Sequence, residues 1–565
     1  MSGIIRRVLF YAVVGLVATA AHAGDAPAAD EHPGPDARFY LATRTVPGYV
    51  ESGARGDALW NAVQSFYRAR DYRLAWVTGG QVSAEAAMLI RLVEQAESEG
   101  LDGPHDRRDP AGPRAVTAAF NGAPESDADA VQDVQLTYVF LRYASGLSGR
   151  FDPKAAGPFW LTRARPRDLA PWLEQSLRSG DVVAAFAALS PAHPAYGALK
   201  ACLARYRGIA RQGGWAALPP RLALRRGSRG PQVAALRARL AVEGDLPAAA
   251  SGPADTYDSS VVDGVKRFEQ RHGLAADGIL DAATVAALNV TVEERIRQIE
   301  LNLERWRWLP ADLGRRYLMV NVPSFRLTAY EEGHPPLAMK VVTGKPESPT
   351  PVFGGDMTTV VFSPFWNVPP TIAEDEIIPA VLRDPGYLTR HNLELVRGTQ
   401  VVGPAALRRG DVQIRQRPGT SNSLGLVKFV FPNPFGVYLH GTPAGALFAR
   451  PLRAFSHGCV RVEKPYELAR WVLSGLPRWT PSAIQAAMRS GREGQLALPQ
   501  PIPVYITYQT VQASPDGTAF FWPDVYGHDA AQMPLMPAPS SVPLVPIIAA
   551  APLRPALDPA PAAGN

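Results

Sequence analysis

The sequence predicts an α+β protein of several domains, with a helical N-terminal part and a mostly β C-terminal part. The apolar residues follow a helical period over much of residues 39–220, whereas from residue 315 they alternate along short segments separated by Gly and Pro. Short strands with this turn punctuation argue for a mostly β core in the C-terminal part. The chain has 565 residues, which suggests roughly 3–4 domains.

The first residues are typical of a secretory signal. Two arginines precede an apolar run at residues 8–20, which is shorter than the about 20 residues that cross a bilayer comfortably. An Ala-His-Ala cleavage site follows, so we expect residues 1–23 to be a signal peptide that is cleaved after Ala23. An uncleaved membrane anchor is the alternative, and it leaves the rest of the chain on the same side of the membrane. Residues 24–38 are expected to be a disordered leader.

Residues 39–220 are expected to form a helical domain that carries no catalytic residue. Residues 84–99 have helical apolar spacing and end at Gly100, and residues 130–146 repeat the pattern. Cys202 lies in a helical context and is predicted to be a core residue. Two cysteines in an exported protein do not make a disulfide framework, so both are predicted to be free thiols.

Residues 221–290 are predicted to form a small three-helix module. Helices are expected over 233–240 and 261–270, the second with Val265 and Phe268 pointing inward, and Asp281 is the expected N-cap of a third helix. A charged linker helix within residues 291–314 should tie this module back to the helical domain. Its apolar face comprises Ile296, Ile299, Leu303 and Trp306.

Residues 315–529 are predicted to be the mostly β domain. Expected strands are residues 317–323, 325–330, 337–343, 358–362 and 502–508, with a loop at 348–353 and a hairpin at 516–526. The segment from about 366 to 420 has helical pieces among loops. Residues 530–565 are rich in Pro and Ala and are expected to be a disordered tail.

One motif in the C-terminal third indicates nucleophilic chemistry. The sequence Val-Tyr-Leu-His at 437–440 predicts a strand that delivers His440 at its end. After a spacer of fifteen residues, residues 456–459 are Ser-His-Gly-Cys. A thiol reacts as its thiolate, its ordinary pKa is about 8.5, and a neighbouring imidazole can take its proton. We therefore predict Cys459 as nucleophile and His440 as general base.

The neighbours of the thiol have predicted supporting roles. Gly458 permits a tight turn, so the amides of Gly458 and Cys459, with the Ser456 hydroxyl, are candidates for an oxyanion hole. His457 lies two residues before Cys459 and points to the same face of an extended segment, where it either orients the thiol or packs. Arg461 lies on that face too and is a candidate partner for a substrate carboxylate.

Other interpretations of the motif are weaker. A lone buried cysteine is usually inert, but here it accompanies two histidines in a spaced pattern. A zinc site is disfavoured because there is no second Cys pair and no His-x-x-x-His helix, so no metal and no other cofactor is expected. The net charge of +6 is dispersed without a basic run, which gives no support to nucleic-acid binding.

The chain resembles the large Gram-negative L,D-transpeptidases of the YkuD type. His440, the fifteen-residue spacer, Ser-His-Gly-Cys and the following Val-Arg are similar to the catalytic motif of that family. Residues 221–290 resemble the peptidoglycan-binding domain type 1, with a longer link at 247–256. Residues 39–220 are similar to the N-terminal scaffold domain, and the segment at about 366–420 resembles a capping subdomain over the active site.

The resemblance implies a reaction. The Cys459 thiolate attacks the carbonyl of residue 3 in a stem tetrapeptide and expels D-Ala, and the amine of a second stem takes the acyl group to give a 3→3 cross-link. A cap that excludes water suits this acyl transfer. Many family members have an acidic residue where Gly441 stands, so here the backbone carbonyl is left to orient His440. The implied substrate-binding candidates are Arg461, Tyr438, Asn422, Lys428 and Trp366, although packing is the favoured role of Trp366.

The expected partners follow from the same resemblance. They are donor and acceptor stem peptides of peptidoglycan and its glycan, through the small module, in the periplasm. Other wall-synthesis enzymes are further candidates, and a membrane contact is expected only through an uncleaved signal segment. Two alternatives stay open: an L,D-carboxypeptidase or endopeptidase that passes the acyl group to water, and a non-catalytic wall-binding protein.

Overall fold

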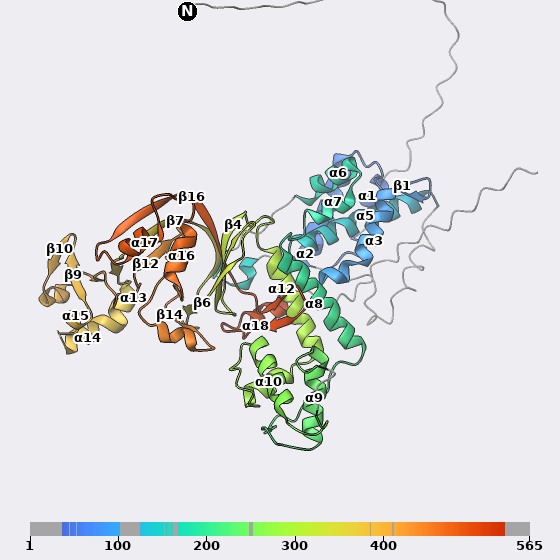
Figure 1. Ribbon diagram of the computed structural model, residues 1–565. Helices are drawn as coiled ribbons and strands as arrows, with labels where there is room; N and C mark the ends of the chain where they lie inside the picture. The colour runs from blue at the N-terminus through green and yellow to red at the C-terminus, as the bar shows by residue number, and fades with distance from the viewer. Residues whose placement is uncertain are drawn as a thin grey trace, which may run out of the picture.

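The computed structural model describes residues 37–536 except 44–45, 52, 102–124, 152, 158, 162–167, 248–251, 385 and 410–411. A helical region, a small helical module and a large sheet that carries a cap at its far end are arranged around two central helices (Figure 1). The predicted signal peptide, nearly all of the predicted leader and most of the predicted tail lie outside the described residues. The α+β multidomain class is confirmed.

Among the described helices, none combines the length and the apolar character that crossing a membrane needs.

The N-terminal region is helical, as predicted. Ser83 caps its third helix by accepting from the Ala86 amide, and the following turn ends at Gly100 with φ 68°. The buried Asp133 carboxylate accepts from the Tyr67 hydroxyl and from backbone amides of residues 75–77, which ties two helices and a small hairpin together. The elements are α1 (Arg38–Thr43), α2 (Ala54–Ala69), β1 (Val77–Thr78), β2 (Gln81–Val82), α3 (Ala84–Glu94), η1 (Ala96–Glu99), α5 (Glu125–Ser148), α6 (Leu169–Ser179), α7 (Val182–Ala187) and α8 (Pro194–Arg211).

The small module has the three predicted helices, α9 (Pro231–Glu243), α10 (Ser259–Arg271) and α11 (Ala282–Leu288). Val265 and Phe268 are fully buried, and the Asp281 side chain accepts from the Thr284 amide, as expected. The module is fixed to the rest of the chain, because Arg271 bonds the Asp245 carboxylate and the Ala519 carbonyl of the C-terminal hairpin.

The linker helix α12 (Val292–Arg307) joins the regions. Thr291 and Glu294 form a capping box at its start. Ile299, Leu303 and Trp306 are buried against the helix α8, which confirms the predicted apolar face. α12 lies beside α8 at the centre of the molecule (Figure 1).

The C-terminal region is a ten-stranded sheet with the order β12-β13-β15-β6-β5-β4-β16-β7-β3, and β14 pairs with β6. An additional pairing of β12 with β7 closes the sheet on itself. Helices α16 (Pro465–Val472) and α17 (Pro481–Met488) pack against it. The strands are β3 (Trp160–Leu161), β4 (Arg316–Asn321), β5 (Arg326–Glu331), β6 (Leu337–Gly344), β7 (Val352–Phe362), β12 (Val427–Val430), β13 (Leu439–His440), β14 (Ala454–Ser456), β15 (Val460–Val462) and β16 (Gly494–Thr507).

Three features of this sheet differ from the expectation. β7 begins at Val352, inside the predicted loop at 348–353, and β16 begins eight residues before the predicted start at 502. The edge strand β3 comes from the N-terminal region and pairs in parallel with β7, Trp160 opposite Val352. Each difference arises from pairing between segments far apart in the sequence, which local alternation does not report.

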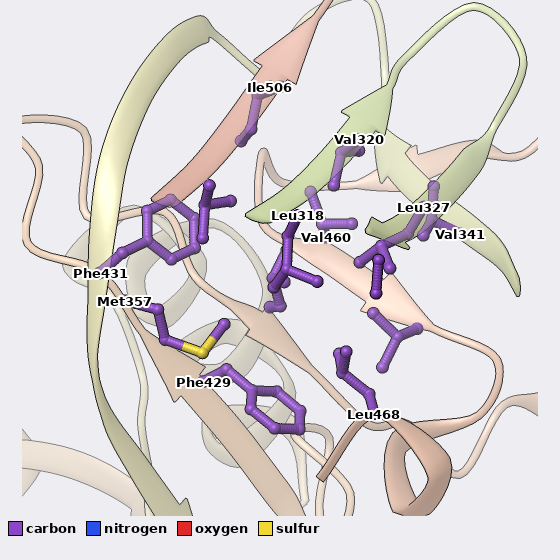
Figure 2. Close-up of a cluster of buried hydrophobic side chains, with 14 of the residues drawn as sticks. Leu318, Val320, Leu327, Val341, Met357, Phe429, Phe431, Val460, Leu468 and Ile506 are labelled. Carbon is purple, nitrogen blue, oxygen red and sulfur yellow. The ribbon is translucent and has the colours of Figure 1, made fainter. Parts of the chain in front are cut away.

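The sheet encloses the main hydrophobic core. Side chains from several strands and from α16 converge there, because alternate residues of each strand point inward (Figure 2). The labelled members are Leu318, Val320, Leu327, Val341, Met357, Phe429, Phe431, Val460, Leu468 and Ile506.

The cap, residues 366–416, contains the helical pieces that the sequence predicts and also an unpredicted sheet. That sheet has four strands in the order β10-β9-β11-β8. Its strands are only two to five residues long, which explains why no alternation was visible. The cap elements are β8 (Trp366–Asn367), α13 (Pro370–Ile372), the π-helical turn η3 (Ala373–Ile377), α14 (Ile378–Arg383), α15 (Tyr387–Arg390), β9 (Leu393–Arg397), β10 (Gln400–Val402), η4 (Pro404–Arg409) and β11 (Gln413–Gln416).

The domain ends with a hairpin, β17 (Val511–Ala513) and β18 (Ala519–Phe521), followed by α18 (His528–Gln532) and η6 (Met533–Leu535). The predicted start of a disordered tail at 530 is therefore wrong. Gln532 is buried and accepts from Arg305, which also pairs with Asp529 at 2.7 Å. At the other end, helix α1 begins at Arg38, so the predicted leader ends slightly earlier than expected.

Candidate active site

Three neighbouring strands place the predicted catalytic residues on one face of the sheet. β13 pairs in parallel with β15, with His440 opposite Arg461, and antiparallel with β12, with His440 opposite Lys428. The Val460 amide donates to the Tyr438 carbonyl at 3.1 Å, so Cys459 lies beside Tyr438. Side chains alternate along strands, and Leu439 and Val460 point into the core.

The opposite face therefore holds a set that we call the catalytic face: Lys428, Tyr438, His440, Cys459 and Arg461. On neighbouring strands, residues two positions out of register on one face are diagonal neighbours, within reach of long and aromatic side chains. His440 and Cys459 are such a pair, with Tyr438 between them. The prediction that a strand delivers His440 at its end is confirmed, since β13 ends there.

His440 is buried and held by its own chain. Its Nδ1 donates to the Gly441 carbonyl at 2.6 Å, so Nε2 is the nitrogen that can accept a proton. This confirms that a backbone carbonyl orients the ring in place of an acidic side chain. Burial, and then the nearby cations Arg461 and Lys428, lower the pKa of His440 to about 3.

The Cys459 thiol is half-buried beside Tyr438. The backbone amide of Tyr438 and then its hydroxyl interact with the sulfur, and a contact of 3.8 Å joins the sulfur to the Gly436 carbonyl. Burial raises the pKa of Cys459, while Tyr438 and the cations Arg461 and Lys428 act in the opposite direction. At neutral pH the resting site therefore contains a neutral thiol and a neutral imidazole.

Tyr438 links the members of the catalytic face. Its ring centroid lies 5.6 Å from that of His440, and the Lys428 ammonium lies 5.6 Å from the same ring. Sequence reasoning named Tyr438 as a substrate-binding residue. The structure instead places its hydroxyl on the nucleophile.

The backbone around the nucleophile is folded by Ser456. Its hydroxyl donates to the Cys459 carbonyl at 2.5 Å and accepts from the Gly458 amide at 3.2 Å. The prediction that the Gly458 amide and the Ser456 hydroxyl hold an oxyanion is therefore wrong in this arrangement, because both are used inside the loop. The Cys459 amide has no hydrogen-bond partner among the described residues and stays the candidate donor.

His457 does not contact the thiol. Its Nε2 lies 3.0 Å from a carboxylate oxygen of Glu376, which belongs to the π-helical turn of the cap. Of the two roles left open for His457, the structure favours neither; it gives the side chain a third one, a contact between the nucleophile segment and the cap. Both side chains are partly exposed.

Two residues predicted as substrate-binding candidates, Asn422 and Trp366, have structural roles in the cap. Asn422 is fully buried, and its side chain donates to the carbonyls of Pro364 and Arg417 and accepts from the Leu424 amide. The prediction of a binding role for Asn422 is therefore wrong: it anchors the base of the cap. Trp366 packs in the cap core, in agreement with the packing role that the sequence favoured.

The catalytic face carries two cations without a carboxylate partner among the described residues. Arg461 is largely buried, its Nε has no hydrogen-bond partner in the described part of the chain, and burial lowers its pKa. Lys428 projects over the Tyr438 ring instead of pairing with an acid. A buried guanidinium with an open N–H favours an anionic ligand.

Sequence reasoning missed Glu376 and Thr350. Thr350 is buried and donates to the Gly458 carbonyl at 2.8 Å. The available signal was a threonine flanked by two prolines, in the segment that was predicted only as a loop. Glu376 ends a run of three acidic residues at 374–376, which by itself carries no functional information.

Comparisons with known proteins match three parts of the chain to domain families. The model of the L,D-transpeptidase catalytic domain (YkuD) matches residues 315–483, the Scaffold domain model matches residues 61–203, and the model described as "Putative peptidoglycan binding domain" matches residues 229–288. A Haemophilus influenzae protein described as "Putative L,D-transpeptidase" is 31% identical over 282 residues, which cover 48% of this chain and 57% of that relative. The match thus spans less than two thirds of that relative.

Solved structures give weaker similarity. An L,D-transpeptidase (Yku) from Stackebrandtia nassauensis is 14% identical and covers 50% of this chain and 94% of that chain, with a TM-score of 0.20. L,D-transpeptidase 3 from Mycobacterium tuberculosis, in complex with a faropenem-derived adduct, is 16% identical and covers 34% of this chain and 60% of that chain, with a TM-score of 0.17.

Proposed function

We propose that this chain, which contains a YkuD-type L,D-transpeptidase catalytic domain beside a scaffold domain and a peptidoglycan-binding module, is a peptidoglycan L,D-transpeptidase that forms 3→3 cross-links through a thioester on Cys459. The observation that carries the proposal is the catalytic face, on which Tyr438 touches both the thiol and the ring of His440. The matched domains support peptidoglycan as the substrate class.

The first half-reaction forms the acyl-enzyme. As the sulfur of Cys459 attacks the carbonyl carbon of stem residue 3, its proton passes to Nε2 of His440, and the carbonyl oxygen becomes an oxyanion near the Cys459 amide. The tetrahedral species then expels the amine of D-Ala, which takes the proton from His440. A thioester between Cys459 and the donor stem remains.

The second half-reaction transfers the acyl group. The side-chain amine of a second stem attacks the thioester carbon and gives a proton to His440. The carbon–sulfur bond breaks, and His440 returns the proton to the Cys459 sulfur. The product is an amide between two stems. A cap that keeps water away from the thioester favours the amine over hydrolysis.

Arg461 and Lys428 supply positive charge that complements a carboxylate of the substrate. They flank His440 on the neighbouring strands, and neither has a carboxylate partner among the described residues. A carboxylate of the donor stem would satisfy the open N–H of Arg461. The same cations disfavour protonation of His440, which keeps the base free.

The small module is proposed to bind glycan of the wall, and the enzyme is proposed to act in the periplasm after export through residues 1–23. The match to a peptidoglycan-binding model supports the first statement. Mass spectrometry of the protein from a periplasmic fraction tests the second, with a mature N-terminus at Gly24 as the expected result.

Muropeptide analysis tests the proposed activity. Purified protein is incubated with disaccharide tetrapeptides, and the products are separated and identified by mass. We expect a dimer that has lost one D-Ala, no product with Cys459→Ala, and retained sacculus binding by that variant. Cys202→Ala is the matched control and should keep full activity, because Cys202 is buried in α8, in a cluster that contains no residue of the catalytic face. Activity in Cys459→Ala would refute the mechanism, and a trimmed tripeptide without dimer would assign the chain as a hydrolase.

A further inference from the structure

We propose that Thr350 is a positioning residue that aims the amide of Cys459 at the developing oxyanion. The proposal rests on the proposed acyl transfer through Cys459. Thr350 is only 1% exposed, so it does not touch substrate. It acts through the peptide unit between Gly458 and Cys459.

The hydroxyl of Thr350 is held at both of its hydrogen-bonding positions. It accepts from the Gly344 amide at 2.8 Å and donates to the Gly458 carbonyl at 2.8 Å. The backbone of Thr350 is also restrained, because a proline stands on each side of it and the residue before a proline is confined to extended conformations. The Thr350 hydroxyl is therefore a fixed donor for the Gly458 carbonyl.

The geometry of a trans peptide carries this restraint to the nucleophile. The carbonyl of one residue and the N–H of the next lie in one plane and point in opposite directions. Because Thr350 fixes the Gly458 carbonyl, it also fixes the Cys459 N–H in the opposite direction. That amide has no hydrogen-bond partner among the described residues, unlike the Gly458 amide, which donates to Ser456.

Gly458 permits this orientation. Its φ is 111°, in the region that favours glycine, and an added Cβ would meet nothing closer than 3.8 Å. The requirement for glycine is thus conformational and not steric. It allows the peptide to turn its carbonyl inward to Thr350.

Tyr526 supports Thr350 from behind. Its hydroxyl accepts from the Thr350 amide at 3.2 Å and donates to the Gly344 carbonyl at 2.6 Å. The Tyr526 amide in turn donates to the Tyr508 hydroxyl at 2.8 Å. Tyr526 lies beyond residues 315–483, so the segment after the matched catalytic domain contributes to the site.

Two reactions of the same sulfur separate this role from general support. Acylation by p-nitrophenyl acetate passes through an oxyanion, with p-nitrophenolate as leaving group. Alkylation by iodoacetamide displaces iodide at a saturated carbon and forms no oxyanion. Both rate constants are measured on the full chain with the Cys202→Ala background, by nitrophenolate absorbance and by mass.

We expect Thr350→Val, which keeps the shape and removes the hydroxyl, to acylate about 10- to 100-fold more slowly, since removal of a direct oxyanion donor costs about 100- to 1,000-fold. Its alkylation rate should stay within about twofold of wild type on the same reasoning. Thr350→Ser restores the hydroxyl and should recover most of the acylation rate. Tyr526→Phe should change acylation in the same direction by a smaller factor, and it carries the test if Thr350→Val does not fold.

Unchanged acylation in Thr350→Val, or an equal fall of acylation and alkylation, overturns the proposal. Failure of the proposed function gives a different result, because then wild-type Cys459 itself is not acylated. Acylation of wild type that is unaffected by the loss of the Thr350 hydroxyl removes this inference and leaves the proposed function standing.

Discussion

Burial moves the nucleophile and the base of the catalytic face toward their neutral forms. It raises the pKa of the Cys459 thiol and lowers the pKa of His440 to about 3. A thiolate–imidazolium pair is therefore not the resting state, and the proton moves as the sulfur attacks. The backbone amide and the hydroxyl of Tyr438 and the two cations favour the thiolate at that moment.

The first prediction concerns the pH dependence of acylation. His440 protonates only near about pH 3, so lowering the pH from 7.5 to 5 leaves the base neutral and the competent form populated. We expect the acylation rate constant of wild type to show no inflection near 6.5, the ordinary histidine value. In His440→Gln the rate should instead rise with pH, because only preformed thiolate then reacts. A decrease in the wild-type acylation rate constant centred near pH 6.5 would contradict this account.

The second prediction concerns Tyr438. Tyr438→Phe removes the hydroxyl that hydrogen-bonds the sulfur, so the thiol pKa should rise further. A hydrogen bond to a charged group is worth about 1.5–3 kcal/mol, so acylation should slow by about 10-fold or more. Alkylation by iodoacetamide at a fixed pH should slow as well, unlike in Thr350→Val, because negative charge on the sulfur drives the attack in both reactions. Thiolate absorbance during a pH titration measures the shift, and an unchanged thiol pKa would exclude this role.

The sequence singles out Cys459 and His440 as the proposed nucleophile and base, because their spacing and the flanking strand pattern are local, and the structure places both on one face of the sheet. Thr350 could not, since its contact joins residues 108 positions apart and depends on how the sheet closes. The predicted binding role of Asn422 was wrong for a different reason. A polar residue near the motif suggests a ligand contact, but its side chain is fully used by backbone groups at the base of the cap.

At the scale of elements, the cap is joined to the nucleophile segment through Glu376 and His457 at 3.0 Å. Glu376 lies in a π-helical turn, a feature often found at functional sites. The pair is partly exposed, so it adds little to stability. It can still hold the cap against the site of the proposed thioester.

The third prediction follows from this contact. Glu376→Gln should leave the melting temperature nearly unchanged and raise the ratio of hydrolysed tripeptide to cross-linked dimer severalfold, because a looser cap admits water to the thioester. Muropeptide analysis gives the ratio. Glu374→Gln, in the same turn and without a contact to His457 among the described residues, is the matched control. An unchanged product ratio in Glu376→Gln would show that this contact of the cap does not control the choice between water and the acceptor amine.

The fourth prediction concerns the edge strand β3. Trp160 is 2% exposed and contacts Trp308 and His528, each with ring centroids 5.3 Å apart. Trp160→Ala should destabilise the sheet by about 3–5 kcal/mol, the usual cost of truncating a buried tryptophan. Calorimetry measures the loss, and Trp160→Phe should recover part of it. A melting temperature within a degree of wild type would show that β3 is dispensable.

The sequence was least informative about β3 and the cap sheet. Long periodic helices such as α12 and strands with clear alternation such as β5 were predicted well, because their apolar pattern is local. β3 has two residues and belongs by sequence to the helical region, so only its pairing with β7 defines it as a strand. The cap strands have only two to five residues. β9 and β10 form a tight hairpin, but β11 pairs with β9 and with the more distant β8.

At the scale of the whole molecule, buried polar groups hold the small module against the rest of the chain. Arg239 and Glu243 form an ion pair at 2.7 Å, and the Tyr206 hydroxyl of α8 bonds the same carboxylate. The Arg239 guanidinium lies 3.9 Å from the Trp215 ring centroid. The module therefore has a fixed position relative to the sheet, which would connect the proposed wall binding to the proposed catalysis.

Four histidines in different regions extend the same physics to overall stability: His272 and His440 are buried, and His193 and His528 are partly buried. Burial lowers the pKa of each of them, to about 3 for His440 and about 4 for His528. At a pH above the ordinary histidine pKa of about 6.5, these side chains are neutral in both the folded and the unfolded state and do not reduce the free energy of unfolding. Below that pH the unfolded chain binds protons that the folded chain does not bind, so the free energy of unfolding decreases as the pH falls.

The last prediction is a loss of thermal stability in mild acid. Each such histidine contributes up to about 1.4 kcal/mol per pH unit below 6.5. Asp133 and Glu269, whose pKa values are raised mainly by burial, act in the opposite sense, so the test uses a difference between proteins. His528→Phe keeps the aromatic contacts with Trp160 and Tyr508 and removes one titrating group. Melting temperatures measured by calorimetry from pH 7.5 to 4.5 should fall less steeply for His528→Phe than for wild type, and parallel curves would exclude His528 as a source of acid sensitivity.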